Sequence, residues 1–279
     1  MWFWIVSLLL TIIAMLGNAQ VIYLILTRRR LRTKANWFVF SLAMADLISV
    51  SVFIPPHFSC KIAGCDHSMV ILHLVSYFGQ ASATNIIAFT ADRYVAIVLP
   101  LRYPQIITKK KIILILMSAW LAPLLLDTIP KVLLSNKNIV QLTSMVMFQI
   151  SPCFFLAIAT RKMINIANKH SRRTSVLLKQ LKFNQPSHRM RGKPEASSAR
   201  LITIMVGVFL ICYISQSLSS LCGCFPSCKE FQPEEFVRYT LSFLLIINSG
   251  ANPFVYALFK GDIKREFARM YFCKTRRER

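Results

Sequence analysis

Charged and amide side chains lie inside three long apolar stretches of this 279-residue chain. Asp92 and Arg93 stand side by side near the end of the stretch 69–98. Asp46 lies about halfway along 37–55, and two amides, a proline and a tyrosine fall within 248–256. Ionisable groups in hydrocarbon are costly and usually line a functional cavity or pathway. For Asp92 and Arg93 the alternative is an anchor whose arginine reaches the membrane surface.

The apolar stretches themselves indicate membrane-spanning helices. The chain is 55% hydrophobic and its mean hydropathy is +0.51, which is too apolar for a soluble domain of this length. A transmembrane helix needs about 20 mostly apolar residues, and no stretch alternates as barrel strands do. The stretches that qualify are 2–26, 37–55, 69–98, 112–126, 139–159, 201–221 and 236–259. We therefore predict an all-α membrane protein, a seven-transmembrane helix bundle, with 2–26 as its first span and not a signal sequence.

The net charge of +23 is concentrated in alternate loops between the predicted spans. Basic residues crowd 28–34, 102–111, 161–200 and the tail after 260, whereas the intervening loops carry few. By the positive-inside rule the basic loops are cytoplasmic and the amino terminus is extracellular. This distribution predicts a multi-pass membrane protein that contacts anionic membrane lipids, and it argues against nucleic acid as a partner.

The predicted organisation has three parts. The bundle occupies 1–259, and within it a basic third inner loop, with the ends of the fifth and sixth helices, covers 160–200. A surface helix and a basic cytoplasmic tail occupy 260–279, because 260–267 has the amphipathic pattern of a helix lying along the membrane. Cys273 follows this helix and is a candidate for acylation.

Together, the motifs of the chain resemble those of the rhodopsin-like (class A) seven-helix G-protein-coupled receptors. Each motif is weak alone, but they occur in family order and spacing along the whole chain. They are Gly17-Asn18, the run 42–46, Asp92-Arg93-Tyr94, Trp120, Pro152, Phe209 with Cys212, and Asn252-Pro253 followed by Tyr256. The resemblance implies a receptor that binds an extracellular ligand and activates a heterotrimeric G protein, and not an enzyme with catalytic residues or a cofactor.

The resemblance also implies a switch in the cytoplasmic half of the bundle. Arg93 would pair with Asp92 and Glu195 in the inactive receptor, and would meet the Gα subunit after the sixth helix swings outward. The residues expected to form this switch are Asp92, Arg93, Tyr94, Glu195, Phe209, Tyr213, Asn252, Pro253 and Tyr256.

A sodium site is the second expectation that the resemblance carries. A carboxylate with hydroxyl and amide oxygens suits a hard cation, and the ion would favour the closed state of the receptor. The matching residues are Asp46, Ser82, Asn248, Ser249 and Asn252. The alternative is a hydrated packing cluster that holds no specific ion.

Several departures from the family pattern bear on stability and activation. Ser68 stands near the usual third-helix cysteine and the outer loop 127–138 has no cysteine, so the usual disulfide between them cannot form. The cysteines available for one or two local disulfides are Cys60, Cys65, Cys222, Cys224 and Cys228. Tyr213 and Ser215 replace the usual tryptophan and proline of the sixth helix, and Thr160 replaces a fifth-helix tyrosine. A non-signalling or constitutively active receptor is therefore an alternative.

The expected ligand follows from two positions. Val75 stands where monoamine receptors carry an aspartate, and Ile246 stands where opsins carry the lysine that binds retinal. We therefore expect a non-amine, non-retinal ligand, such as a peptide, a lipid-like molecule or a chemosensory cue. The expected pocket wall is Val75, Ser76, Gly79, Gln216, Ser217, Ser220, Arg238 and Ser242. Arg238 either receives an anionic or carbonyl group or pairs with Glu234 or Glu235 outside the pocket.

Two other classes of protein place polar residues in membrane helices. A channel or secondary transporter should show an internal repeat between its halves, and the sequence shows none. A membrane enzyme would need a second acid near Asp46, or a histidine-based site at mid-depth, whereas four of the five histidines fall in predicted loops. The receptor remains the prediction.

Overall fold

The computed structural model of the chain describes residues 2–63, 69–134, 137–181, 194–224 and 235–272, and the side chains near several ends of these ranges fall outside the description. Helices account for nearly all of the described residues, which include no strand. The predicted acylation site Cys273 and the side chains of the outer-loop cysteines lie outside the described part of the chain. Cys153 and Cys212 are described and both are free thiols.

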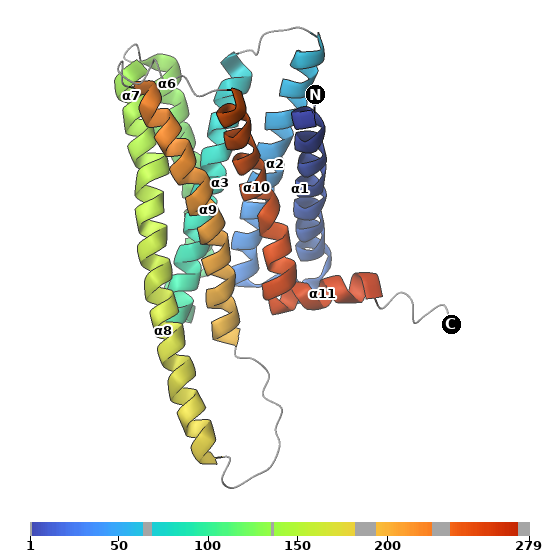
Figure 1. The fold of residues 1–279 in the computed structure, drawn as a ribbon. Coiled ribbons are helices and arrows are strands. Elements are labelled where there is room, and N and C mark those ends of the chain that lie inside the picture. The colour runs from blue at the N-terminus through green and yellow to red at the C-terminus, as the bar shows by residue number, and fades with distance from the viewer. Residues whose placement is uncertain (1, 64–68, 135–136, 182–193, 225–234, 273–279) are drawn as a thin grey trace, which may run out of the picture.

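Seven helical columns stand side by side in the bundle (Figure 1). The first three columns are single helices, and the fourth and fifth each contain one wider, π-helical turn. In chain order the columns are α1 (Trp2–Thr27), α2 (Lys34–Ala63), α3 (Met69–Val98), then α5 (Lys109–Pro123) with η2 (Leu124–Thr128) and α6 (Ile129–Leu133), then α7 (Lys137–Met145) with η3 (Val146–Ile150) and α8 (Ser151–Leu181), then α9 (Pro194–Cys224) and α10 (Glu235–Phe259). Two short helices, η1 (Arg29–Leu31) and α4 (Tyr103–Ile106), lie in the first two inner loops, and α11 (Gly261–Phe272) follows the seventh column.

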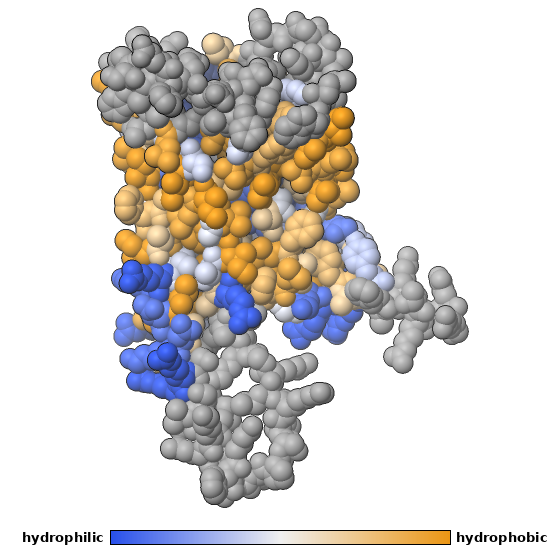
Figure 2. All heavy atoms as spheres, in the orientation of Figure 1, coloured by the Kyte–Doolittle hydropathy of each residue, from blue (hydrophilic) through white to orange (hydrophobic). Residues whose placement is uncertain are grey.

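The columns have the length and surface of a membrane domain. Among the described residues, six columns are long and apolar enough to cross a membrane, and α10 joins them as a seventh when it is taken with α11, from which it is bent by 87°. On the face seen in Figure 2, a broad hydrophobic band covers the bundle, and hydrophilic residues gather where α8 and α11 project. The predicted all-helical, seven-transmembrane bundle is therefore confirmed.

The fourth column extends beyond the expected span 112–126. It begins at Lys109, where the Thr108 side chain accepts a hydrogen bond from the backbone N–H of Lys111, and it continues to Leu133. The sequence analysis placed Asp127 at the start of an outer loop, and the structure corrects this. Asp127 is buried within η2, and Lys131 lies one turn later with its ammonium 2.9 Å from the Asp127 carboxylate. Because that pairing neutralises the charge, the helix can continue past an acidic residue that ends the apolar run.

Close contact between α1 and α10 fixes the seventh column against the first. A Cβ added to Gly17 would lie 3.0 Å from the Cβ of Pro253, and one added to Gly250 would lie 3.2 Å from that of Ala14. A larger residue at either position would require the facing side chain to shift, so glycine favours this close approach. The Asn18 amide donates to the carbonyl of Ser249 at 3.1 Å and to that of Ala14 at 3.0 Å, so this buried amide finds the neighbouring-helix partner that its depth requires.

A polar junction turns the chain from α10 into α11 at the cytoplasmic end. The buried Asn36 amide, at the start of α2, donates to the Asp262 carboxylate at 2.9 Å and to the Leu31 carbonyl at 2.8 Å. Lys260 lies 3.1 Å from the same carboxylate, which also accepts from the backbone N–H of Ile263 at 2.9 Å. Burial raises the pKa of Asp262, but Lys260 and these donors outweigh it and hold that pKa below its ordinary value. The junction ties α11 to the first inner loop.

Candidate functional site

A buried carboxylate lies at the centre of the bundle. Asp46 on α2 has no exposed surface, and both of its oxygens accept hydrogen bonds from neighbouring helices. The Ser82 hydroxyl on α3 donates to one oxygen at 2.6 Å, and the Asn252 amide on α10 donates to the other at 2.7 Å. Two consecutive helices, α2 and α3, therefore meet the distant α10 at one acid.

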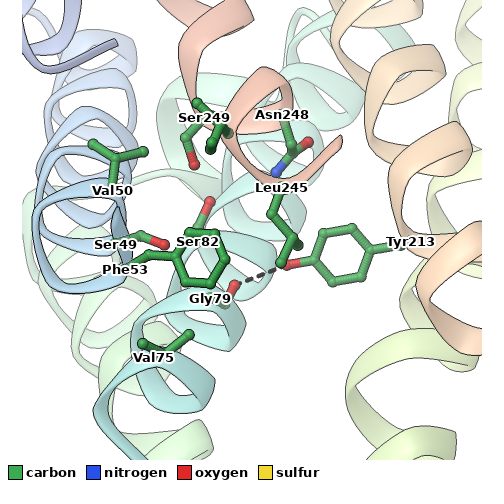
Figure 3. Close-up of a pocket in the computed structure, with 11 residues that line it drawn as sticks. Ser49, Val50, Phe53, Val75, Gly79, Ser82, Tyr213, Leu245, Asn248 and Ser249 are labelled. Atoms are coloured by element: carbon green, nitrogen blue, oxygen red, sulfur yellow. Dashed lines mark hydrogen bonds between the residues drawn. The ribbon is translucent and has the colours of Figure 1, made fainter. Parts of the chain in front are cut away.

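A cavity of about 30 Å³ borders Ser82, which donates to this carboxylate, and is large enough for a water molecule or a small ion; Asp46 and Asn252 do not line it themselves. Figure 3 shows Ser82, Asn248 and Ser249 around one part of the cavity and Val75 and Gly79 around another, with Tyr213 reaching across from α9. Hydroxyl, amide and carboxylate oxygens are ligands that hard cations accept. A cation here would use the Asp46 charge, and Ser82 and Asn252 would turn from donors into oxygen ligands.

Tyr213, which borders this cavity, connects the sixth column to the third. Its hydroxyl donates to the Gly79 carbonyl at 2.8 Å, which is the hydrogen bond drawn in Figure 3. Its ring stacks on Phe209, with centroids 4.0 Å apart and an interplanar angle of 16°. Tyrosine in place of the family's tryptophan therefore provides a polar tie between α9 and α3.

The Ser215 that replaces the family's proline bonds within its own helix. Its hydroxyl donates to the Ile211 carbonyl at 2.9 Å. Serine keeps its own backbone N–H, which proline would lose, so the replacement does not break the helical hydrogen-bond ladder of α9. Hydroxyl groups bonded in this way often bend helices slightly.

Tyr256 is fully buried beside Phe89, with the two ring centroids 6.3 Å apart. Among the described residues, no group forms a hydrogen bond with its hydroxyl. A buried hydroxyl without a partner costs free energy that a second conformation can recover. This unsatisfied group therefore favours movement of Tyr256.

The Asp92 and Arg93 pair lies near the carboxyl-terminal end of α3. The Arg93 Nε donates to Asp92 Oδ2 at 2.9 Å, and its Nη2 contacts the same oxygen. The other oxygen, Oδ1, accepts from the Tyr103 hydroxyl of α4 at 2.8 Å. Burial of its ring and the nearby Asp92 charge raise the pKa of Tyr103, so its hydroxyl stays protonated and donates throughout the physiological range. Sequence reasoning missed Tyr103, whose only signal was a tyrosine shortly after Pro100.

The structure shows fewer contacts for the remaining predicted switch residues. Tyr94 is half-buried against the hydrophobic core, and Phe209 and Pro253 are buried. Glu195 lies in the first turn of α9, but its side chain is outside the described residues, so its pairing with Arg93 stays a prediction.

The residues of the predicted ligand wall that the structure describes lie mainly in three places: the central cavity, a groove between the fifth and sixth columns, and the polar cluster around Ser76. Val75 and Gly79 line the central cavity. Ser217 does not: it borders a separate apolar groove of about 350 Å³ between the fifth and sixth columns, and its hydroxyl donates to the Tyr213 carbonyl at 2.7 Å. In this structure Ser217 therefore faces the fifth column and not the cavity that Val75 borders, and its role in ligand binding stays a prediction. Gln216 is half-buried. The side chains of Ser220, Arg238 and Ser242 lie outside the described part.

Ser76 belongs to a polar cluster that the sequence analysis did not assemble. Its hydroxyl accepts from Lys131 at 3.2 Å and lies 3.5 Å from both the Asp127 carboxylate and the Gln80 amide. Gln80 also donates to the Ser144 hydroxyl on α7 at 3.3 Å. The cluster joins the third, fourth and fifth columns. The detectable signal was the Asp127 to Lys131 spacing of four, which suits one helical turn.

The arrangement of a buried carboxylate, a tie between the third and sixth columns and an arginine at the inner end is that of a seven-helix receptor. Residues 17–256 match the model of the family "7 transmembrane receptor (rhodopsin family)", so the chain belongs to that family. It is 29% identical to the octopamine receptor beta-2R of Chilo suppressalis, with 96% of this chain and 79% of the relative covered. It is 30% identical to the octopamine receptor beta-1R of Drosophila melanogaster (95% and 62% covered) and 25% identical to the human adenosine receptor A2a (95% and 71% covered).

Proposed function

We propose that this protein is a plasma-membrane receptor that converts binding of an extracellular ligand into nucleotide exchange on a heterotrimeric G protein. The observation that carries the proposal is the arrangement at the inner end of α3, where Asp92 holds Arg93 and is itself held by Tyr103. An arginine kept in place by one buried acid can be released by a modest movement. Released, it offers a fixed set of donors to a partner at the cytoplasmic surface.

The proposed mechanism is a two-state equilibrium that both ends of the bundle bias. In the closed state Tyr213 ties α9 to α3, and Asp92 retains Arg93. A ligand that breaks the Tyr213 bond would favour outward movement of α9, and a G protein that binds Arg93 would favour the same open state. Tyr256, whose hydroxyl lacks a described partner, would gain one on moving inward.

We further propose that sodium stabilises the closed state at Asp46. The Ser82 hydroxyl and the Asn252 amide nitrogen both donate to this acid, and Asn248 and Ser249 border the cavity beside Ser82. To bind a cation, the Asn252 amide would turn so that its oxygen faces the ion. A cation there would hold three columns together, and it would have to leave when they separate. This makes sodium an allosteric inhibitor and not a catalytic cofactor.

The expectation of a non-amine ligand has no support from the relatives, because two of those compared above are named as octopamine receptors. The expectation rested on Val75, which removes the carboxylate from one position of the third helix only. Asp127 supplies a carboxylate from the fourth column, 3.5 Å from the hydroxyl of Ser76, the residue next to Val75. The absence of an acid at Val75 is therefore no reason against an amine ligand.

Membrane lipids are proposed as partners at the inner face. A basic pocket of about 370 Å³ is bordered by Arg28, Arg29 and Arg30 of the first inner loop and by Arg269 of α11. Glu266 neutralises part of this charge, since it lies 2.6 Å from Arg269 and 3.9 Å from Arg28. The surplus positive charge suits the phosphate of an anionic lipid at the cytoplasmic leaflet.

The proposal is tested by nucleotide exchange on purified Gα subunits of each class, with the receptor in membranes. Arg93→Ala should abolish receptor-dependent exchange, while Arg102→Ala, an exposed arginine in the same inner region, should not. Exchange retained by Arg93→Ala would reduce Arg93 to a membrane anchor.

The alternatives give different results in the same membranes. A wild-type receptor at the cell surface that never promotes exchange would support the non-signalling alternative. High exchange without any added ligand, lost in Arg93→Ala, would support the constitutively active one. Ion current or solute uptake without exchange would favour a channel or transporter.

A further inference from the structure

Asp127 is an acid buried without complete hydrogen bonding. It has no exposed surface, and its Oδ2 interacts with the Lys131 ammonium at 2.9 Å and lies 3.5 Å from the Ser76 hydroxyl. Its other oxygen, Oδ1, is buried and accepts no hydrogen bond from any described residue. An unmade hydrogen bond of a buried carboxylate is costly, so this oxygen favours a guest that brings a donor.

The surroundings of Asp127 are also rich in acceptors. Gln80 uses its amide nitrogen toward Ser76 and Ser144, while its buried Oε1 has no donor among the described residues. Two hydroxyls and two unsatisfied acceptors thus meet between the third, fourth and fifth columns. A guest that suits them is a good donor with positive charge. An alkylammonium has both properties, with three N–H donors on one centre.

Lys131 shows that the carboxylate accepts an alkylammonium group. Its side chain is 20% exposed, whereas that of Asp127 is fully buried, so the lysine reaches the acid from the more accessible side. Lysine side chains are flexible and strongly hydrated, so Lys131 can withdraw toward water at modest cost. Ser76 directly follows Val75, which borders the central cavity, so the cluster and that cavity share one turn of α3.

We propose that Asp127 is the counter-ion for a ligand that carries an ammonium group, and that Lys131 is a tethered competitor occupying this position until the ligand binds. The ligand ammonium binds the Asp127 carboxylate, and Ser76 and Gln80 accept from its remaining donors. The inference rests on the proposed receptor function, because it names the ligand class of that receptor. The proposed charged subsite lies on the fourth column, whereas monoamine receptors carry their aspartate on the third helix.

The test measures binding directly, without a G protein, on the full-length receptor in lipid nanodiscs. The probes are octopamine and phenethylamine, which are cations at neutral pH, and 2-phenylethanol as a neutral analogue of phenethylamine. Binding is followed by the rise in melting temperature with probe concentration. At least one amine should bind the wild type, while 2-phenylethanol should bind much more weakly.

Two substitutions separate a ligand subsite from a structural ion pair. Asp127→Asn should weaken amine binding by about 10- to 150-fold, the range expected for loss of a hydrogen bond to a charged group. Lys131→Gln should strengthen it several-fold, because the competitor is gone while the carboxylate remains. A merely structural pair predicts that both variants lower stability and that neither changes amine affinity selectively.

The double variant Asp127→Asn with Lys131→Gln leaves no buried unpaired charge, so it tests the inference even if Asp127→Asn fails to fold. Amine binding by this double variant as tight as by the wild type overturns the inference, as does failure of both amines to bind wild type and Lys131→Gln at millimolar concentration. If the amines do not bind but exchange that depends on Arg93 persists, only this inference fails. If they bind but no Gα subunit responds, only the proposed function fails.

Discussion

Replacing Tyr103 with phenylalanine should raise the activity of the receptor without ligand. The substitution keeps the ring and removes one hydroxyl, the sole described donor to Asp92 Oδ1. A hydrogen bond to a charged group contributes about 1.5–3 kcal/mol. Tyr103 is only half-buried, so water can partly replace it, and we take the lower end of that range. If the bond exists only in the closed state, the closed-to-open constant falls about tenfold, since about 1.4 kcal/mol is a factor of ten.

The expected consequence is measurable without a ligand. For a receptor that is open about 1% of the time, a tenfold change brings the open fraction to roughly 10%, and basal nucleotide exchange rises nearly in proportion. The assay is basal exchange in membranes, normalised to the number of receptors at the surface. Tyr23→Phe is the matched control, because the Tyr23 side chain on α1 is 55% exposed at the surface of the bundle.

A change of less than twofold in Tyr103→Phe, with normal surface expression, would refute the reasoning. It would mean either that the hydrogen bond persists in the open state or that Asp92 does not restrain Arg93. A fall in basal exchange would be more damaging, because it would assign Tyr103 to the open state.

Three further predictions concern stability. Asp46→Asn should abolish the rise in melting temperature that sodium chloride gives over choline chloride, and an unchanged sodium response would place the ion elsewhere. Gly17→Val should lower the melting temperature by several degrees, since even a Cβ at Gly17 would lie 3.0 Å from Pro253, whereas Gly207→Ala should not, because nothing lies within 4 Å of its added Cβ. Asp262→Asn should be less stable than wild type at neutral pH. The native pKa of Asp262 is lowered, so the stability difference between wild type and Asp262→Asn should be constant at pH values well above the ordinary pKa of 3.8. The difference should shrink below pH 3.8 and vanish once the pH falls through the native pKa. A difference that grows on acidification would contradict the predicted direction.

The sequence by itself determined the class of this protein. Long apolar runs leave a helical bundle as the structure that satisfies their backbone hydrogen bonds in lipid, and the α3 span 69–98 was located to the residue. The family motifs also located the polar centre, because an acid such as Asp46 is too costly in an apolar helix without partners on other helices. These inferences depend on composition and spacing, which are local properties of the chain.

Tertiary structure alone decided which charged side chains are neutralised and which residues neutralise them. Asp127 ended an apolar run and therefore predicted a loop, yet Lys131 one turn later and Ser76 from another helix allow it to be buried within the fourth column. Tyr103 carried no motif, and only the fold of the second inner loop places its hydroxyl on Asp92. The free energy of a buried charge depends on partners brought from distant segments, and the direction in which a side chain leaves its helix selects those partners. Neither quantity can be obtained from hydropathy along the chain.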